Sequence, residues 1–193
     1  MEAVERIADA LVRAVDLRDS YTGEHSESVA DLARRVGARL GIGGVNLKLL
    51  ELAARLHDLG KLAVPDGILH KPGPLDELEW QRMRRHSAVG AEMLAGVPGL
   101  EPVAPLVRWH HERWDGRGYP DGLRGEAIPL ECRVICACDA FHAMSAERPY
   151  RPALAPAVAL AELEAGAGEQ FDPDVVHAVM AEAGPGGRVA SAR

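Results

Sequence analysis

The chain has 193 residues, of which 47% are hydrophobic, and this size and composition suit one domain with a substantial buried core. Its formal net charge of −7 at pH 7 argues against general nucleic-acid binding, because that function needs a basic surface. No apolar run approaches the ~20 residues that span a membrane, and no segment resembles a signal peptide, so we expect a cytoplasmic protein that does not insert into membranes. Cys132, Cys136 and Cys138 lack the second pair of a structural zinc site, and we expect reduced thiols.

Apolar residues recur at helical spacing along most of the chain. They predict helices over 4–15, 29–40, 47–59, 76–94, 101–111, 130–144 and 156–164, and a last helix starting at Asp172-Pro173. Residues 112–129 are rich in Gly and Pro and are expected to form a structured loop. No segment alternates strongly in hydrophobicity as a strand does, so the predicted fold class is all-α.

Histidines and aspartates recur as neighbouring pairs in this pattern. His57 precedes Asp58 in a Leu-rich helical segment, and His110 precedes His111 at the end of another. Neighbouring residues on a helix point roughly 100° apart, so both members of a pair can border one pocket. The full set of candidate metal ligands is His25, His57, Asp58, His86, His110, His111 and Asp139.

Each candidate also has an ordinary structural explanation. A lone histidine such as His25 or His86 is more often a surface or hydrogen-bonded residue than a ligand. Lys61 follows Asp58 by three residues and either extends its stem along a helix end or pairs with a phosphate. Asp139 lies in an apolar segment, where a carboxylate is costly unless a cation accompanies it.

Five histidines and two aspartates exceed the needs of one tetrahedral zinc ion. They suit two ions of higher coordination number, with Asp58 as the bridging ligand. Because the set contains imidazoles and carboxylates but no thiolate, iron, manganese, nickel and zinc all fit. Two ions that share a water molecule lower its pKa and clamp a phosphate, so the residues predict metal-assisted phosphoester hydrolysis with Asp58 and Lys61 in catalytic roles.

At these residues the chain resembles the HD-GYP family of the HD phosphohydrolase superfamily, and the similarity covers about residues 16–180. The stretches that carry it, in order, are Tyr-Thr-Gly-Glu-His-Ser (21–26), His57-Asp58-Leu-Gly-Lys61, Lys71-Pro-Gly-Pro-Leu, Met83-Arg-Arg-His86, His110-His111-Glu-Arg-Trp-Asp-Gly-Arg-Gly-Tyr-Pro120, Asp139-Ala-Phe-His-Ala-Met and Arg148-Pro-Tyr-Arg151-Pro-Ala. The length of the His-His-Glu…Gly-Tyr-Pro stretch makes the resemblance specific.

The resemblance implies an HD-domain helical bundle with an additional Gly-Tyr-Pro loop and C-terminal helices. It implies a centre of two or three divalent metal ions, often iron, that hydrolyses cyclic di-GMP to pGpG and often onward to GMP. The same seven residues would be the metal ligands. By the same resemblance Lys61, Arg148 and Arg151 would bind substrate phosphates, and Tyr119 would lie in the loop beside the site.

The chain departs from the family pattern at two positions that concern the site. Family members with three metals have Glu four residues before the first histidine, where this chain has Tyr21, so we expect two metals with iron favoured. His142 stands three residues after Asp139, where the family usually has Asp. It either alters the support of that ligand or faces solvent.

Alternatives to the cyclic di-GMP phosphodiesterase remain open. One is an enzyme for another cyclic dinucleotide, such as 3′,3′-cGAMP. Another is a non-catalytic receptor or interaction module that binds a diguanylate cyclase through the Gly-Tyr-Pro loop. The complete ligand set argues against the receptor, because degenerate members usually lose ligands.

The expected organisation is an N-terminal helix over 1–20, a catalytic domain over 21–183 and a disordered tail over 184–193. Family members commonly carry a sensor domain upstream, so the first helix is expected either to link to such a domain or to belong to a stand-alone enzyme. Val4, Ile7, Leu11 and Val15 form an apolar stripe on this helix. The stripe either forms a homodimer seam or packs on its own domain.

Overall fold

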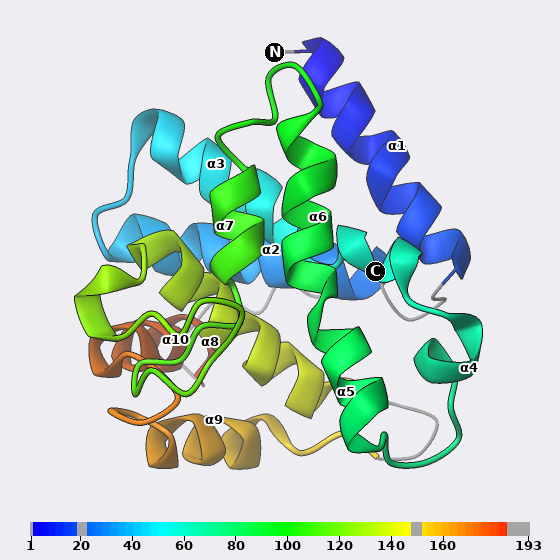
Figure 1. Ribbon diagram of the computed structural model, residues 1–193. Coiled ribbons are helices and arrows are strands. Elements are labelled where there is room, and N and C mark those ends of the chain that lie inside the picture. Colours follow the sequence, from blue (N-terminus) through cyan, green and yellow to red (C-terminus); the bar gives the residue numbers. More distant parts are fainter. Residues whose placement is uncertain (1, 19–22, 148–151, 185–193) are drawn as a thin grey trace.

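The computed structural model describes residues 2–18, 23–147 and 152–184, and within them the chain forms helices, turns and one isolated β-bridge between Ala167 and Phe171. The predicted all-α class is therefore confirmed (Figure 1). The elements are α1 (Glu2–Arg18), α2 (Gly23–Arg39), α3 (Gly44–Leu56), η1 (Leu59–Ala63), α4 (Asp66–Leu69), α5 (Glu77–Arg84), α6 (His86–Ala95), α7 (Ala104–Trp109), η2 (Gly125–Ala127), α8 (Leu130–Ser145), α9 (Pro156–Ala165) and α10 (Pro173–Ala183).

Helix α2 lies at the centre of the bundle and packs against α3, α8 and α10. Its apolar residues Val29, Ala33 and Val36 are spaced three and four apart, so they share one face, and all three are fully buried. Leu50 of α3 and Ile135 of α8 are fully buried in the same core. Helices α2, α3 and α8, which carry or directly precede His25, His57, Asp58 and Asp139, therefore share one core.

Helix α1 runs along one side of the bundle and packs against α2, α3 and η1 (Figure 1). Val15 is buried, and Val4 and Leu11 pack against the core, whereas Ile7 is 39% exposed. Most of the apolar stripe on this helix therefore packs on its own domain. The homodimer seam stays a prediction. None of the described helices combines the length and apolarity needed to cross a membrane.

Three helix boundaries differ from the sequence-based expectation. The helix expected over 47–59 ends at Leu56, so His57 caps it and Asp58 lies in a turn before η1. The helix expected over 76–94 is divided at Arg85 into α5 and α6, although Arg85 itself keeps helical backbone angles. The helix expected over 101–111 ends at Trp109. Each difference falls beside candidate ligands, where tertiary contacts override local helix propensity.

The close approach of η1 to α6 is one such contact. A Cβ atom on Gly60 would lie 1.9 Å from the carbonyl oxygen of His86 and 2.6 Å from the amide nitrogen of Gly90. Only glycine leaves room for these two backbones to touch, and the contact brings the turn at Asp58 next to the first residue of α6. Of the predicted disordered tail 184–193, all but Gly184 lies outside the described residues.

Candidate metal centre

The turn between α3 and η1 supplies the central pair of side chains. Leu56 and Leu59, on either side of the pair, are each only 1% exposed and anchor the turn in the core. His57 and Asp58 are themselves 1% and 5% exposed. A buried ionisable pair must be compensated by partners, and the surrounding helices provide them.

One cluster of candidate ligands joins α2, this turn and α8. His25, His57 and Asp58 each offer one possible metal-binding atom, and these three atoms lie within 4.8 Å of one another. Oδ1 of Asp139 lies 3.0 Å from Nε2 of His25 and 3.9 Å from Nε2 of His57. Four of the seven predicted residues therefore meet in one place.

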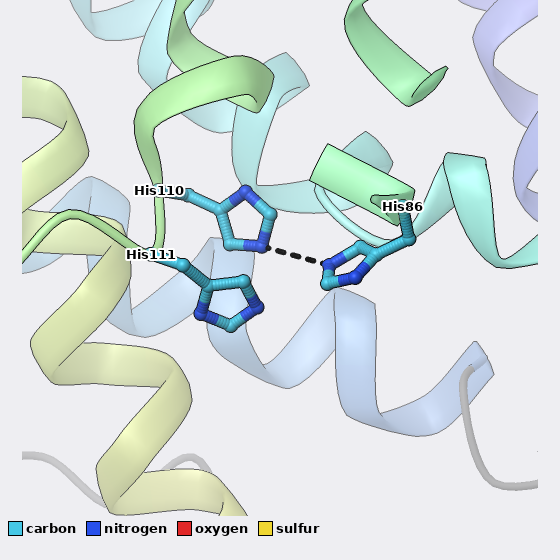
Figure 2. A group of neighbouring side chains, drawn as sticks. All are labelled: His86, His110 and His111. Carbon is cyan, nitrogen blue, oxygen red and sulfur yellow. Dashed lines mark hydrogen bonds between the residues drawn. The ribbon is translucent and has the colours of Figure 1, made fainter. Parts of the chain in front are cut away.

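The other three residues form a second cluster. His86 begins α6, and His110 and His111 directly follow α7; single ligand atoms of the three lie within 4.8 Å of one another. Figure 2 shows their rings converging, with the Nε2 atoms of His86 and His110 3.4 Å apart. The ring centroids of His86 and His111 are 5.0 Å apart.

Asp58, counted above with the first cluster, lies where the two clusters meet. Its Oδ2 is 3.4 Å from Nε2 of His57, and its Oδ1 is 3.7 Å from Nε2 of His86. Nζ of Lys61 lies 2.8 Å from Oδ2. One carboxylate oxygen thus faces each cluster, which is the arrangement that a bridging ligand requires.

Backbone carbonyl groups orient three of the imidazoles. Nδ1 of His57, His86 and His110 lies 2.7, 2.8 and 2.6 Å, respectively, from the carbonyl oxygen three residues earlier. A carbonyl oxygen only accepts, so each Nδ1 carries the proton and donates it. The lone pair of a neutral ring is then on Nε2, which points into the site.

The site lowers the pKa of the second cluster's histidines and of the aspartates. Burial, together with neighbouring imidazoles, holds the pKa of His110 well below its ordinary value and lowers that of His111 to about 3. Burial disfavours both aspartate carboxylates, but other contacts override it and hold the pKa of each well below its ordinary value. For Asp58 these contacts are the charges of Lys61 and His57, and for Asp139 the first is the hydrogen bond with His25. The second cluster is therefore neutral while the aspartates are ionised.

This donor set fits divalent metal ions. A hydrogen bond between the facing Nε2 atoms of His86 and His110 would need a proton on one of them, and burial lowers the pKa of both rings. A shared cation relieves the repulsion between the two lone pairs. Burial opposes the charge on His57, yet the Asp58 carboxylate raises the pKa of His57 to about 9, so this pocket also attracts positive charge.

Of the predicted substrate-binding residues, the structure describes Lys61 and Tyr119. Lys61 is at the edge of the site through its contact with Asp58. The Tyr119 ring lies 4.8 Å from the His111 ring, with an angle of 36° between the ring planes. Arg148 and Arg151, and Tyr21 at the position that distinguishes two metals from three, lie outside the described residues.

Residues that hold the Gly-Tyr-Pro loop were not singled out from the sequence. The buried Glu112 carboxylate accepts hydrogen bonds from the amides of Asp121 and Gly122 at 2.7 and 3.0 Å. A Cβ atom on Gly118 would lie 2.4 Å from the amide nitrogen of Arg113, so only glycine fits there. The sequence motif contained the signal, because Glu112 directly follows His111 and Gly118 directly precedes Tyr119.

His142 lies against the site and not in solvent. Its Nδ1 is 2.7 Å from Nδ1 of His25, on the side of the His25 ring opposite the 3.0 Å contact of Nε2 with Asp139. His142 therefore occupies the place from which a partner can hold the His25 ring in position.

Comparison with known proteins agrees with this geometry. An HD domain family model matches residues 9–175. The chain is 44% identical over 172 residues to the cyclic di-GMP phosphodiesterase response regulator RpfG of Xanthomonas campestris pv. campestris, covering 88% of this chain and 46% of the relative. It is 40% identical over 171 residues to 3′3′-cGAMP-specific phosphodiesterase 3 of Vibrio cholerae, covering 89% of this chain and 37% of that protein.

The fold is shared with solved structures as well. The crystal structure of a cyclic GMP-AMP-specific phosphodiesterase of V. cholerae, V-cGAP3, superimposes with a TM-score of 0.69 at 21% identity, over 90% of this chain and 47% of that one. The chain thus spans less than half the length of these relatives. The family model, the identities and the His-His-Glu…Gly-Tyr-Pro motif together show that this chain belongs to the HD domain family and to its HD-GYP group.

Proposed function

We propose that this chain is a metal-dependent phosphodiesterase that hydrolyses cyclic di-GMP at a binuclear centre. The observation that carries the proposal is the position of Asp58 between two ligand clusters, with one oxygen toward each. Hydrolysis adds water across a P–O3′ bond, which frees a 3′-hydroxyl and leaves a 5′-phosphate. The first product is pGpG, and cleavage of its remaining phosphodiester gives GMP.

Two divalent ions would be held by the two clusters. One would be bound by His25, His57 and Asp139 and the other by His86, His110 and His111, with Asp58 shared between them. When bound, such ions activate water and neutralise charge on a phosphate. Imidazole and carboxylate ligands without thiolate suit iron, manganese, nickel and zinc. Iron is the first choice because of the resemblance to the HD-GYP family.

Binding and positioning of the substrate would fall to other residues around the clusters. The Lys61 ammonium is held next to Asp58, where it would bind a non-bridging phosphate oxygen and stabilise charge as the P–O bond breaks. Arg148 and Arg151 would bind the phosphates, since they follow Asp139 as in the family motif. Tyr119, packed on His111, would limit how the nucleotide enters the site.

A second candidate substrate is 3′,3′-cGAMP. It is favoured by the relative named as specific for that dinucleotide, which is nearly as similar to this chain as the relative named for cyclic di-GMP. A non-catalytic receptor is disfavoured because no candidate ligand is missing: three lie together in each of two groups, and Asp139 lies 3.0 Å from His25.

The test is hydrolysis by anaerobically purified protein, followed by chromatography, with metal content measured on the same sample. We expect pGpG or GMP with about two metals per chain. Asp58→Ala should abolish product and lower metal content. Glu164→Ala, which removes an exposed carboxylate on α9, should change neither.

The outcome that overturns the proposal is full metal loading with no cleavage of cyclic di-GMP. Cleavage of 3′,3′-cGAMP alone would then assign the second candidate. Binding of either nucleotide without turnover would assign a receptor.

A further inference from the structure

A cationic and aromatic assembly lies at the edge of the metal centre. The guanidinium carbon of Arg84 is 5.7 Å from the centroid of the Trp80 ring and 5.6 Å from that of the Tyr119 ring. Trp80 and Arg84 are four residues apart on α5 and therefore share one helix face. Tyr119 comes from the Gly-Tyr-Pro loop, so the assembly joins two segments that are distant in sequence.

The assembly leads from the surface to the candidate ligands. Trp80 is 44% exposed and Arg84 is exposed, whereas Tyr119 is half-buried and its ring lies 4.8 Å from the ring of His111. A ligand held against Trp80 and Arg84 would therefore extend directly toward the second cluster.

Within the described residues, the N–H donors of the Arg84 side chain are not engaged by a carboxylate. In the described ranges 2–18, 23–147 and 152–184, no carboxylate forms an ion pair with Arg84, although Lys71 pairs with Glu79 of the same helix at 2.5 Å. The two aromatic rings hold the guanidinium in place. Among the described residues, no hydrogen bond uses its planar fork of N–H groups. If the rings only stabilised α5, we would expect the Trp80 indole to be buried, whereas Trp80 is 44% exposed.

We propose that Trp80, Arg84 and Tyr119 form a subsite for one guanine base of the cyclic dinucleotide. The inference rests on the proposed function, because it assumes a dinucleotide bound at the metal centre. The indole face of Trp80 stacks on the purine, a contact that any base can make. Arg84 donates two hydrogen bonds to the O6 and N7 acceptors of guanine, and adenine presents a donor at the position of O6.

One subsite of this kind reads a single base. It accepts cyclic di-GMP and 3′,3′-cGAMP, because each contains a guanine, and it disfavours cyclic di-AMP. The choice between the two guanine-containing dinucleotides is then made elsewhere in the site.

The test compares binding and cleavage in Arg84→Ala, Arg84→Lys and Arg82→Ala. Arg82 is an exposed arginine of the same helix, and two residues along a helix place it on nearly the opposite face, so it is the matched control. Calorimetry measures the Kd of cyclic di-GMP and cyclic di-AMP on metal-loaded protein. Cleavage is followed with both dinucleotides and with bis(p-nitrophenyl) phosphate, which has no base.

For Arg84→Ala we expect the affinity for cyclic di-GMP to fall by roughly 10- to 100-fold, with the loss in kcat/KM arising mainly from KM. Arg84→Lys should keep the positive charge yet lose most of the preference for guanine over adenine. An ammonium lacks the planar pair of N–H donors that would match O6 and N7. Trp80→Phe should lose less affinity than Trp80→Ala, since a smaller ring still stacks. Arg82→Ala should resemble the wild type.

Two results overturn the subsite. One is an unchanged ratio of the cyclic di-GMP and cyclic di-AMP affinities in Arg84→Ala. The other is an equal loss of dinucleotide and bis(p-nitrophenyl) phosphate cleavage, which would mean that Arg84 only supports the metal centre. Wild-type protein that binds cyclic di-GMP but never cleaves it would refute the proposed function while leaving the subsite to be decided by the affinities.

Discussion

Single side chains around the clusters determine how each candidate ligand is presented. His57, His86 and His110 are oriented by backbone carbonyls, whereas the described partner of Nδ1 of His25 is another side chain, His142. A ring held by a side chain depends on one residue that can be substituted without changing the helix. Substitution of His142 therefore tests how the His25 ring is positioned without removing His25 itself.

We expect His142→Ala to weaken metal binding by about 10-fold or more, because the His25 ring would lose the partner that fixes its orientation. His142→Asp should retain binding, since a carboxylate also accepts a hydrogen bond from Nδ1 and is the residue usual in the family. Metal titration of the apoprotein measures both affinities. Equal affinities in the wild type and His142→Ala would show that His25 is positioned by other contacts.

At the scale of elements, the Gly-Tyr-Pro loop is attached to the end of α7. Arg108 donates two hydrogen bonds of 2.7 Å to the Asp121 carboxylate, and the indole N–H of Trp109 donates a third of 2.7 Å. Glu112 holds the same part of the loop through backbone amides. Because His110 and His111 lie between these anchors, the loop and the second cluster are positioned together.

This attachment predicts that the stability of the fold depends on pH through Asp121. Hydrogen bonds from Arg108 and Trp109 lower the pKa of Asp121 to about 2. A carboxyl group whose pKa is lower in the folded state stabilises the fold above its ordinary pKa near 4, and the contribution disappears as the pH falls through about 2. Asp121→Asn should therefore be less stable than the wild type at pH 7, and the difference should shrink between pH 4 and pH 2.

Urea unfolding of both proteins across pH 7 to pH 2 measures the effect. Asp31→Asn is a suitable control, because Asp31 pairs only with arginines of its own helix, Arg34 and Arg35, in the described part of the chain. A stability difference for Asp121→Asn that stays constant with pH would contradict the prediction.

At the scale of the molecule, the candidate ligands tie separate parts of the bundle to one another. They come from α2, the turn after α3, the start of α6, the end of α7 and α8. Metal ions bound there would add cross-links between elements that already pack on the shared apolar core. Ions that bind only the folded state stabilise it by a free energy that grows with the logarithm of the ion concentration divided by its Kd.

We expect chelation to lower the Tm of metal-loaded protein by about 5–15 °C, given the size of the chain and ligand present at many times its Kd. Asp58→Ala, which lacks the shared carboxylate, should show a smaller shift. Calorimetry with and without chelator measures both. An identical Tm for loaded and chelated wild-type protein would mean that the clusters do not bind metal in solution.

Local sequence patterns were sufficient for the all-α class and for most helices, because a helix's apolar face is encoded every three or four residues. The adjacent pairs His57-Asp58 and His110-His111 are local patterns too, and they made those four residues candidate ligands. His25, His86 and Asp139 stand apart in the sequence, and the resemblance to the HD-GYP family was needed to join them to the set. The helix breaks at His57, Arg85 and Trp109 were not predictable in this way. They depend on contacts such as that of Gly60 with α6, which join residues far apart in the chain.

The sequence by itself determined which chemical groups this protein can bring to a phosphate: imidazoles, carboxylates and an ammonium. Only the tertiary structure decided their geometry. Packing of the bundle placed Asp58 between two clusters and turned the Nε2 atoms of His57, His86 and His110 inward. It also brought Trp80, Arg84 and Tyr119 together. The physical reason is that side-chain identity is a property of each position, whereas distances of a few ångströms between different helices are set by how the whole core packs.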